Sequence, residues 1–140
     1  MRALIDTNVI LDALMGREPF RRAAEEIILL AASEKITACI TASSVTDLYY
    51  ILHKSLRDRE RAKQAIRGTI AIVSVLDVTA IDCEKAFDLS MPDYEDALQV
   101  QCAKRHKVDC IISRDLRHFA GSPVKAVLPD DFLRSFRQRF

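Results

Sequence analysis

Short apolar runs in this chain alternate with longer segments in which apolar residues recur every three or four positions. Ala23, Ala24, Ile27, Ile28 and Ala31 follow the second pattern and fall on one side of a helix. The full pattern predicts strands at residues 3–5, 36–40, 72–78, 109–113 and 124–128, and helices at 9–14, 20–33, 43–52, 59–70, 79–89, 92–103 and from 130 onward. Because the strands are continuous apolar runs separated by helices, we expect an α/β fold with a central parallel sheet of four to five strands flanked by helices.

The length and composition suit one compact domain. The chain has 140 residues, is 49% hydrophobic and contains no repeat, low-complexity tract or long linker, so we treat residues 1–140 as a single domain. No run of 18 apolar residues is present, which argues against a membrane span. Acidic residues interrupt the apolar N-terminal segment, which is unlike a secretory signal, and we expect the protein to stay in the cytoplasm.

Four cysteines are present and none of them forms a C-x-x-C pair. They are Cys39, Cys83, Cys102 and Cys110, and each lies in an apolar or helical pattern. We interpret them as small buried apolar residues of a reducing compartment, although a zinc site or a disulfide remains an alternative.

The net charge of +1 does not by itself indicate a nucleic-acid partner, but basic residues are concentrated in two segments. The first segment contains Lys54, Arg57, Arg59, Arg61, Lys63 and Arg67, and the second contains Arg134, Arg137 and Arg139. Such patches can bind a polyanion through counterion release. For either patch alone, a solvated helix face is the simpler interpretation.

Four aspartates occupy positions that favour chemistry in a parallel α/β fold. Asp6 and Asp115 follow strongly apolar strands, Asp96 lies in the first turn of the helix after Pro92, and Asp47 is expected in the first turn after Ser43 or Ser44. Ligands of such folds bind beyond the carboxyl ends of the strands, where these side chains should converge. Asp47 and Asp96 have an alternative structural explanation, because acids also stabilise helix N-termini.

A group of carboxylates without basic partners repels itself unless a cation is bound. Oxygen ligands are the ones that Mg²⁺ and Mn²⁺ prefer. The residues themselves therefore point to a divalent-metal site. A divalent ion held there can activate water and neutralise charge on a phosphate, which is the physical basis for a nuclease hypothesis.

Four segments resemble, in the correct order, the motifs of the PIN-domain nucleases. They read LIDTN at 4–8, TASSVTDLYY at 41–50, DYEDA at 93–97 and IISRDLRHF at 111–119. The resemblance covers nearly the whole chain, and the size is similar to that of the VapC-type toxins of toxin–antitoxin pairs. Two positions differ from the family pattern, because Asp47 stands where glutamate is commoner and His118 stands where aspartate is common.

This resemblance implies a PIN-like three-layer fold and a role for each matched residue. Asp6, Asp47, Asp96 and Asp115 would be catalytic, and Asp6, Asp96 and Asp115 would hold the metal. Asn8, Ser43, Thr46 and Ser113 would support the carboxylates by hydrogen bonds, as would Asp93, one helical turn before Asp96. The residues expected to contact substrate are Arg114, Arg117 and His118. For His118, a contact with the metal or no role at all are alternatives.

The activity implied by the resemblance is that of an endoribonuclease dependent on Mg²⁺ or Mn²⁺, which leaves 5′-phosphate and 3′-hydroxyl ends. Single-stranded or looped RNA is the expected substrate, with a small antitoxin and a second copy of the chain as partners. Leu48, Tyr49, Ile51 and Leu52 either form part of such a partner surface or pack in the core. The alternative, motivated by Asp47 and His118, is a PIN-like module that binds RNA or a protein and no longer cuts.

Other hydrolytic chemistries find little support in the sequence. A phosphatase that uses an aspartyl phosphate would want a second aspartate two residues after Asp6, where Asn8 stands instead. No G-x-S-x-G motif and no glycine-rich phosphate loop is present.

Overall fold

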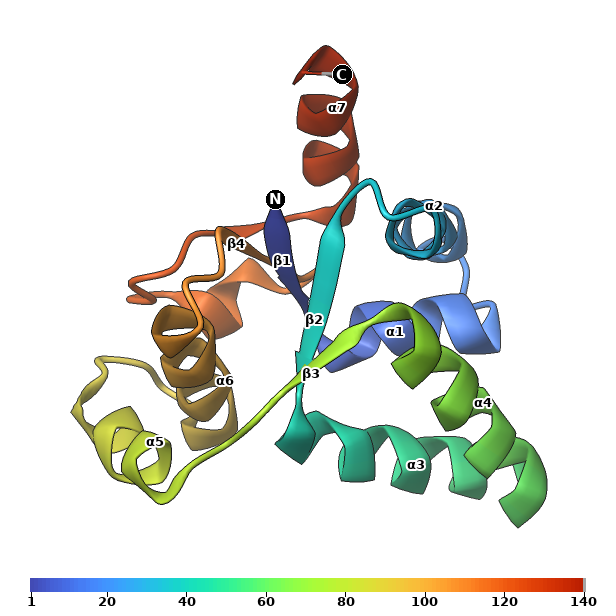
Figure 1. The fold of residues 1–140 in the computed structure, drawn as a ribbon, viewed down its shortest axis with the longest axis horizontal. Coiled ribbons are helices and arrows are strands. Elements are labelled where there is room, and N and C mark those ends of the chain that lie inside the picture. The colour runs from blue at the N-terminus through green and yellow to red at the C-terminus, as the bar shows by residue number, and fades with distance from the viewer. Residues whose placement is uncertain (140) are drawn as a thin grey trace.

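The computed structural model describes residues 1–139 and contains a parallel sheet with the strand order β3-β2-β1-β4-β5 (Figure 1). The strands are β1 (Arg2–Ile5), β2 (Thr37–Thr41), β3 (Ser74–Leu76), β4 (Cys110–Ile112) and β5 (Ala126–Val127). Every pairing between neighbouring strands is parallel. The α/β fold with a sheet of four to five strands is therefore confirmed.

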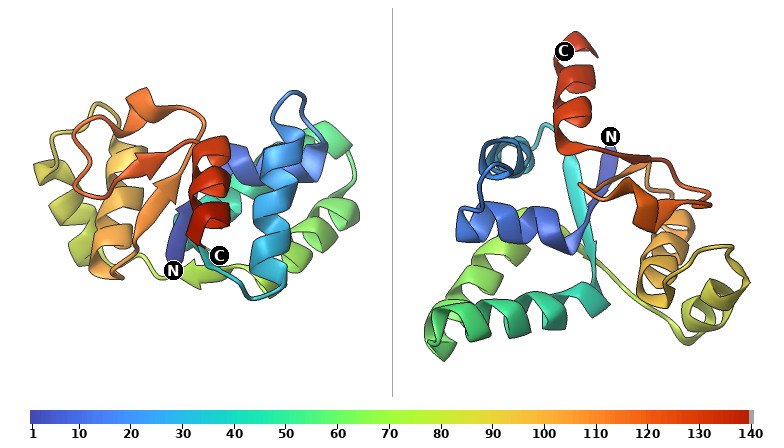
Figure 2. Two further views of the ribbon diagram at one scale, coloured as in Figure 1. Left: turned by 90° about the horizontal axis from the view of Figure 1, so that it is seen from above. Right: turned by 180° about the vertical axis from the view of Figure 1, so that it is seen from behind.

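Helices cover both faces of this sheet (Figure 2). The α-helices are α1 (Thr7–Met15), α2 (Arg21–Ala32), α3 (Ala42–Leu56), α4 (Arg59–Ile72), α5 (Ala80–Lys85), α6 (Tyr94–Arg105) and α7 (Pro129–Arg139). Two 3₁₀ turns follow α5 and β4, namely η1 (Ala86–Asp88) and η2 (Leu116–Phe119).

The alternation of side chains along each strand divides the core into two parts. On β1, Ala3 and Ile5 join buried residues of α1, α2, α3, α4 and α7 on one face, whereas Leu4 points to the other face. There Leu4 packs with Ile111 of β4, with Val100 of α6 and with Phe119 of η2. Both faces of the central strands are thus buried, which explains their continuous apolar sequence.

β1 lies between β2 and β4, so the chain leaves the central strand toward one side of the sheet and returns on the other side. In open parallel sheets this change of direction opens a crevice at the carboxyl ends of the two strands. Asp6 follows β1 and Ser113 follows β4, and the Asp6 backbone N–H donates to the Ile112 carbonyl at 2.9 Å. The fold therefore brings the first and fourth motifs together.

Several predicted boundaries are wrong by a few residues. Ile72 ends α4 instead of starting a strand, because the helical spacing of Ala62, Ile66 and Thr69 keeps α4 packed to that point. α1 begins at Thr7, which leaves Asp6 at the N-cap position predicted for Thr7 or Asn8.

Two other helices also begin earlier than predicted. α3 begins at Ala42, so Asp47 lies beyond the first turn. α7 begins at Pro129, a residue whose fixed φ and missing N–H suit the first helical position.

Leu48 and Leu52 lie on one face of α3 and are buried in the core. Tyr50 lies between them in the sequence, on another face of the helix, and is exposed. All four cysteines are free thiols, with Cys39 and Cys102 buried. None of the helices within residues 1–139 is long and apolar enough to span a membrane.

Candidate active site

Asp6 is a nearly buried carboxylate at the carboxyl end of β1. Only 8% of the residue is exposed, and its Oδ2 accepts a hydrogen bond from Ser113 Oγ at 2.9 Å. Burial raises the pKa of Asp6 above its usual value, and the bond from Ser113 offsets only part of that effect. The position of Asp6 is thus fixed by the sheet while its negative charge is poorly stabilised.

Asp96 enters the same region from the N-terminal end of α6. Asp93 is the N-cap of this helix, and its Oδ1 accepts the Asp96 backbone N–H at 3.1 Å. Burial, followed by the charges of Asp93 and Asp6, raises the pKa of Asp96 to about 6. Asp93 therefore fixes the backbone of Asp96 and adds to the local negative charge, but does not bond to its carboxylate.

Asp115 and His118 complete the rim after β4. Ser113 Oγ accepts the Asp115 backbone N–H at 3.1 Å, so one buried hydroxyl links Asp6 to the Asp115 loop. His118 of η2 lies between two carboxylates, with Nε2 3.2 Å from Asp115 Oδ2 and Nδ1 3.7 Å from Asp96 Oδ2. Arg117 is exposed, and its Nε lies 3.6 Å from Asp115 Oδ1.

Asp6, Asp47, Asp96 and His118 line one pocket of about 360 Å³, with Asp115 beside His118 at its edge. We call Asp6, Asp47, Asp96 and Asp115 the carboxylate pocket. Asp47 is exposed on α3 and reaches the pocket although it is shorter than glutamate. The four aspartates, far apart in sequence, are thus gathered at one rim of the sheet.

The hydrogen bonds expected from three other residues to these carboxylates are not formed among the described residues. Ser43 Oγ pairs with Thr41 Oγ1 at 2.9 Å, and Thr46 Oγ1 donates to the Ser43 carbonyl at 3.1 Å, because both hydroxyls lie in the first turns of α3 and satisfy local backbone and side-chain groups. Asn8 is exposed at the pocket rim. Of the four residues Asn8, Ser43, Thr46 and Ser113, Ser113 is the one whose side chain donates a hydrogen bond to a carboxylate of the pocket.

Sequence analysis missed several residues of the pocket. They are Thr7, Tyr50, Ile51, Glu95 and Gln99. Gln99 is the most informative, since it is 9% exposed and its Oε1 is buried without a hydrogen-bond partner within the described chain. Gln99 lies three residues after Asp96 on α6, and residues at this spacing share one face of a helix, so the sequence could have predicted its place in the pocket.

Few cations compensate the pocket. Among residues 1–139, no arginine or lysine forms an ion pair with Asp6, Asp47 or Asp96. Arg114 lies near Asp6, but its Nε donates to the buried Asp12 at 2.8 Å and its guanidinium stacks on Phe20.

The donor set fits a divalent cation. Buried carboxylates with raised pKa values, together with the unpaired Gln99 oxygen, provide the hard oxygen ligands that Mg²⁺ and Mn²⁺ select. No three His, Cys, Asp or Glu side chains within the described part of the chain already form a closed metal-binding cluster. Binding would therefore draw the carboxylates toward the ion.

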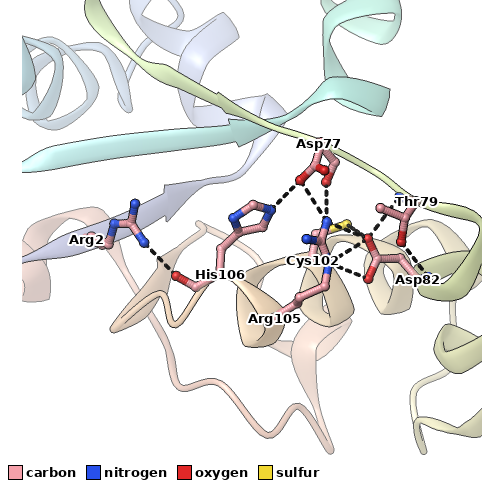
Figure 3. Close-up of polar contacts among 7 residues, drawn as sticks. All are labelled: Arg2, Asp77, Thr79, Asp82, Cys102, Arg105 and His106. Carbon is pink, nitrogen blue, oxygen red and sulfur yellow. Dashed lines mark hydrogen bonds and ion pairs between the residues drawn. The ribbon is translucent and has the colours of Figure 1, made fainter.

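A second group of carboxylates lies at the opposite end of α6 (Figure 3). Asp82 is 0% exposed, and both of its carboxylate oxygens accept from Arg105, at 2.8–3.1 Å. Thr79 completes a capping box with Asp82, while Asp77 accepts from Arg105 at 2.8 Å and contacts His106 Nε2 at 2.7 Å. We call Asp77, Thr79, Asp82, Cys102, Arg105 and His106 the Asp82 cluster.

The charges in this cluster are balanced by the protein itself. Hydrogen bonds from Arg105 lower the pKa of Asp82 well below its usual value, despite complete burial. The same Asp82 contributes to raising the pKa of the Cys102 thiol to about 12, after the larger effect of burial. The cluster ties α5 to α6 and needs no external ion.

Comparison with known proteins agrees with this arrangement. The family model described as the PIN domain matches residues 2–117. No curated protein shows significant sequence similarity to the chain.

Solved structures with the same fold include VapBC2 from Rickettsia felis bound to a promoter DNA fragment, with 16% identity, a TM-score of 0.70 and coverage of 91% of this chain and 98% of that one. DNA-bound VapBC from Salmonella typhimurium gives 21% identity, a TM-score of 0.69 and coverage of 92% and 98%. VapC20 from Mycobacterium tuberculosis, described as a sarcin-ricin loop cleaving toxin, has 17% identity and a TM-score of 0.66, and the match covers 84% of this chain and 93% of that one. At these identities the similarity establishes the fold.

Proposed function

Because this chain belongs to the PIN domain family, we propose that it is an endoribonuclease that hydrolyses phosphodiester bonds with Mg²⁺ or Mn²⁺. We further propose that it acts as the toxin of a toxin–antitoxin pair. The observation that carries the proposal is the carboxylate pocket, in which the fold gathers four aspartates with few cationic partners at the switch point of the sheet.

In this proposal Asp6, Asp96 and Asp115 hold the cation, and Asp47 completes the pocket. A bound divalent ion supplies a water of lowered pKa and neutralises charge that develops on the phosphate. Ser113 keeps Asp6 in place through its 2.9 Å hydrogen bond, and Asp93 keeps the first turn of α6 in place. Asn8 lines the pocket, whereas Ser43 and Thr46 form their hydrogen bonds within the start of α3.

Substrate contacts are assigned to side chains around the pocket. Arg117 is largely exposed next to Asp115 and is suited to a phosphate contact. Arg114 is bonded to Asp12, so it lends positive charge near Asp6 while remaining anchored.

RNA is favoured as the substrate by an aromatic side chain at the pocket. Tyr50 is 67% exposed and lines the pocket beside Asp47. An exposed ring next to a phosphodiester site can stack on an unpaired base, as in proteins that bind single-stranded RNA. VapC20, which shares the fold, is described as a toxin that cleaves the sarcin-ricin loop.

A small antitoxin is the proposed protein partner. Residues of α1, α2 and α4 line an apolar groove of about 490 Å³, bordered by the exposed Leu14, Leu29 and Ile72. Such a groove suits the apolar face of an amphipathic helix. Solved neighbours include toxin–antitoxin complexes. Co-purification with the product of the adjacent reading frame, reduced by Leu29→Glu, tests this partner, and light scattering of the isolated chain tests the proposed homodimer.

The catalytic proposal is tested by incubating the metal-free protein with single-stranded RNA and adding Mn²⁺, Mg²⁺ or EDTA. We expect cleavage with either ion, loss of cleavage in EDTA, and new 5′-phosphate ends. Asp6→Asn should abolish cleavage without unfolding the protein, because it keeps the shape of the side chain.

Asp88→Asn is the matched control, since Asp88 is an exposed aspartate on η1 outside the pocket. Full activity in purified Asp6→Asn, or equal activity in EDTA, would contradict the proposed function.

A further inference from the structure

His118 is held between two acidic residues of the carboxylate pocket. Its Nε2 lies 3.2 Å from Asp115 Oδ2, and its Nδ1 lies 3.7 Å from Asp96 Oδ2. The neighbouring Phe119 is buried in the core and anchors η2, while the His118 side chain is 56% exposed. The backbone is thus fixed and the ring remains able to shift.

Both ring nitrogens lie close to carboxylates, although neither forms a hydrogen bond to one among the described residues. A neutral imidazole has one N–H and one lone pair. If the N–H is on Nε2, the nitrogen nearer to a carboxylate, the lone pair is on Nδ1, which lies 3.7 Å from Asp96 Oδ2. Two electron-rich atoms are then close to each other, an arrangement that a proton or a metal ion between them would stabilise.

The same arrangement occurs around histidines that bind metals. Such histidines usually donate the N–H of the second nitrogen to a carboxylate, which orients the ring and strengthens the ligand. Asp115 Oδ2, at 3.2 Å from His118 Nε2, is close enough to become that carboxylate after a small rotation of the ring, and Asp115 Oδ1 is then left for the ion. In an octahedral site, neighbouring ligands about 2.1 Å from the ion lie about 3 Å apart. A movement of less than one ångström would bring His118 Nδ1 and Asp96 Oδ2 to such a separation.

We propose that His118 is a nitrogen ligand of the divalent ion in the carboxylate pocket, that Asp115 orients its ring, and that the site therefore prefers Mn²⁺ to Mg²⁺. This inference rests on the proposed metal-dependent function and specifies the ion. An imidazole nitrogen strengthens binding of first-row transition ions, whereas Mg²⁺ is a hard ion that favours oxygen ligands and water. The ligand set becomes mixed nitrogen and oxygen.

The geometry favours this role over the substrate contact suggested by the sequence. A histidine that bound phosphate would direct one nitrogen toward the open side of the pocket. Here both nitrogens lie within 3.7 Å of carboxylates that would repel a phosphate. His118 therefore faces the ion and not the incoming RNA backbone.

Electron spin-echo measurements on the full-length protein loaded with Mn²⁺ test the inference directly, because modulation from a bound imidazole nitrogen requires no activity. We expect nitrogen modulation in the wild-type protein, and its loss in His118→Asp and His118→Ala. The other two histidines provide matched controls, so His53→Gln and His106→Gln should retain the signal.

Competition titrations provide the second measurement. His118→Asp restores an all-oxygen site, so the ratio of Mn²⁺ to Mg²⁺ affinity should fall about tenfold or more relative to wild type. Circular dichroism verifies that each variant is folded.

The outcomes separate the inference from the function on which it rests. Mn²⁺ that binds in an Asp6-dependent manner without nitrogen modulation, or modulation that persists in both His118 variants, would overturn the role of His118 alone. An unchanged Mn²⁺ to Mg²⁺ ratio in His118→Asp would overturn the metal preference. Absence of any Asp6-dependent metal binding would overturn the proposed function as well.

Discussion

Two carboxylates at opposite ends of α6, the buried Asp82 of the neighbouring α5 and the partly buried Asp96 of α6 itself, are in opposite electrostatic states. At the C-terminal end, Asp82 accepts hydrogen bonds from Arg105 and Thr79, and its pKa is lowered. At the N-terminal end, Asp96 has no arginine or lysine partner within the described chain, and its pKa is raised to about 6. One end of α6 therefore contacts a carboxylate that the protein neutralises, Asp82 of α5, and the other end carries one that arginine and lysine leave unpaired, Asp96.

The difference teaches which cluster maintains the fold and which is available for chemistry. A buried carboxylate paired with arginine stabilises the structure only as long as both partners are present. Carboxylates held close together without a partner raise the energy of the folded protein, and such strained electrostatics is typical of functional sites. Under the proposed function, a divalent ion bound in the carboxylate pocket removes this cost.

The largest expected effect is on activity and comes from Asp96→Asn. Because the proposed function makes Asp96 a metal ligand, its removal should lower Mn²⁺-dependent RNA cleavage by about a thousandfold or more, while the unfolding midpoint stays level or rises. Single-turnover cleavage and thermal unfolding of the same preparation measure the two effects. A variant that is inactive and also strongly destabilised would erase the contrast between the two ends of α6.

The next effect is on stability and comes from Asp82→Ala. Loss of this buried partner leaves Arg105 uncompensated on one side and breaks the capping box with Thr79, so the free energy of unfolding should fall by about 3 kcal/mol. Urea denaturation measures the loss. Glu84→Gln, an exposed change on the same helix, should leave stability within about 0.5 kcal/mol of wild type.

Metal affinity distinguishes this variant from those of the carboxylate pocket. Under conditions in which Asp82→Ala remains folded, it should bind Mn²⁺ as the wild type does. A stability loss below that of the Glu84→Gln control would show that the Asp82 cluster is not structural.

The two carboxylates should also give opposite pH dependences of stability. The pKa of Asp96 is about 6 when folded and 3.8 in the reference state, so the folded protein binds the extra proton and its stability falls as pH rises from about 4 to 6. Asp96→Asn should therefore be more stable than the metal-free wild type at pH 7, by about 1–3 kcal/mol, and the gain should vanish near pH 4.

Asp82 has the opposite sign, because its folded-state pKa is lowered. Its contribution is complete above the unfolded-state value of 3.8 and is lost as pH falls below it. Urea denaturation from below pH 3.8 up to pH 7 measures how the free energy of unfolding changes with pH for both aspartates. A stability gain from Asp96→Asn that is independent of pH would contradict the raised pKa.

The smallest effect concerns thiol reactivity. Cys102 is buried in the Asp82 cluster and has a pKa raised to about 12, whereas Cys83 is partly exposed. Because the thiolate is the reactive form, iodoacetamide should label Cys83 well before Cys102 in the folded protein. Mass spectrometry after a short labelling pulse measures the order, and early labelling of Cys102 would show that the cluster opens readily.

The sequence was sufficient to predict the α/β fold and the convergence of Asp6, Asp47, Asp96 and Asp115. Asp6 and Asp115 follow apolar strands, Asp96 lies in the first turn of a helix, and the carboxyl ends of parallel strands share one edge. The position of Asp47 relative to the start of α3 was less well predicted, because several hydroxyl residues in succession offered alternative caps.

Contacts between side chains that are far apart in the sequence could not be predicted. Nothing in the spacing of Asp82 and Arg105, which are 23 residues apart, indicates that they pair. The pairing of Arg114 with Asp12 was not predicted either, since Arg114 was expected to contact the substrate. Such pairs depend on how helices pack on the sheet, and periodicity within one element carries no information about that packing.

The most direct test of the central claim is a calorimetric titration of the metal-free protein with Mn²⁺ near neutral pH, repeated with Asp6→Asn and Asp82→Asn. The account predicts saturable binding to wild type and to folded Asp82→Asn, and loss of binding in Asp6→Asn, because Asp6 and Asp96 have no arginine or lysine partner within the described chain, whereas Asp82 is paired with Arg105. Near pH 6, binding should also release protons, since ligands must be deprotonated. Absence of saturable binding to wild type, or equal binding to Asp6→Asn, would contradict the account.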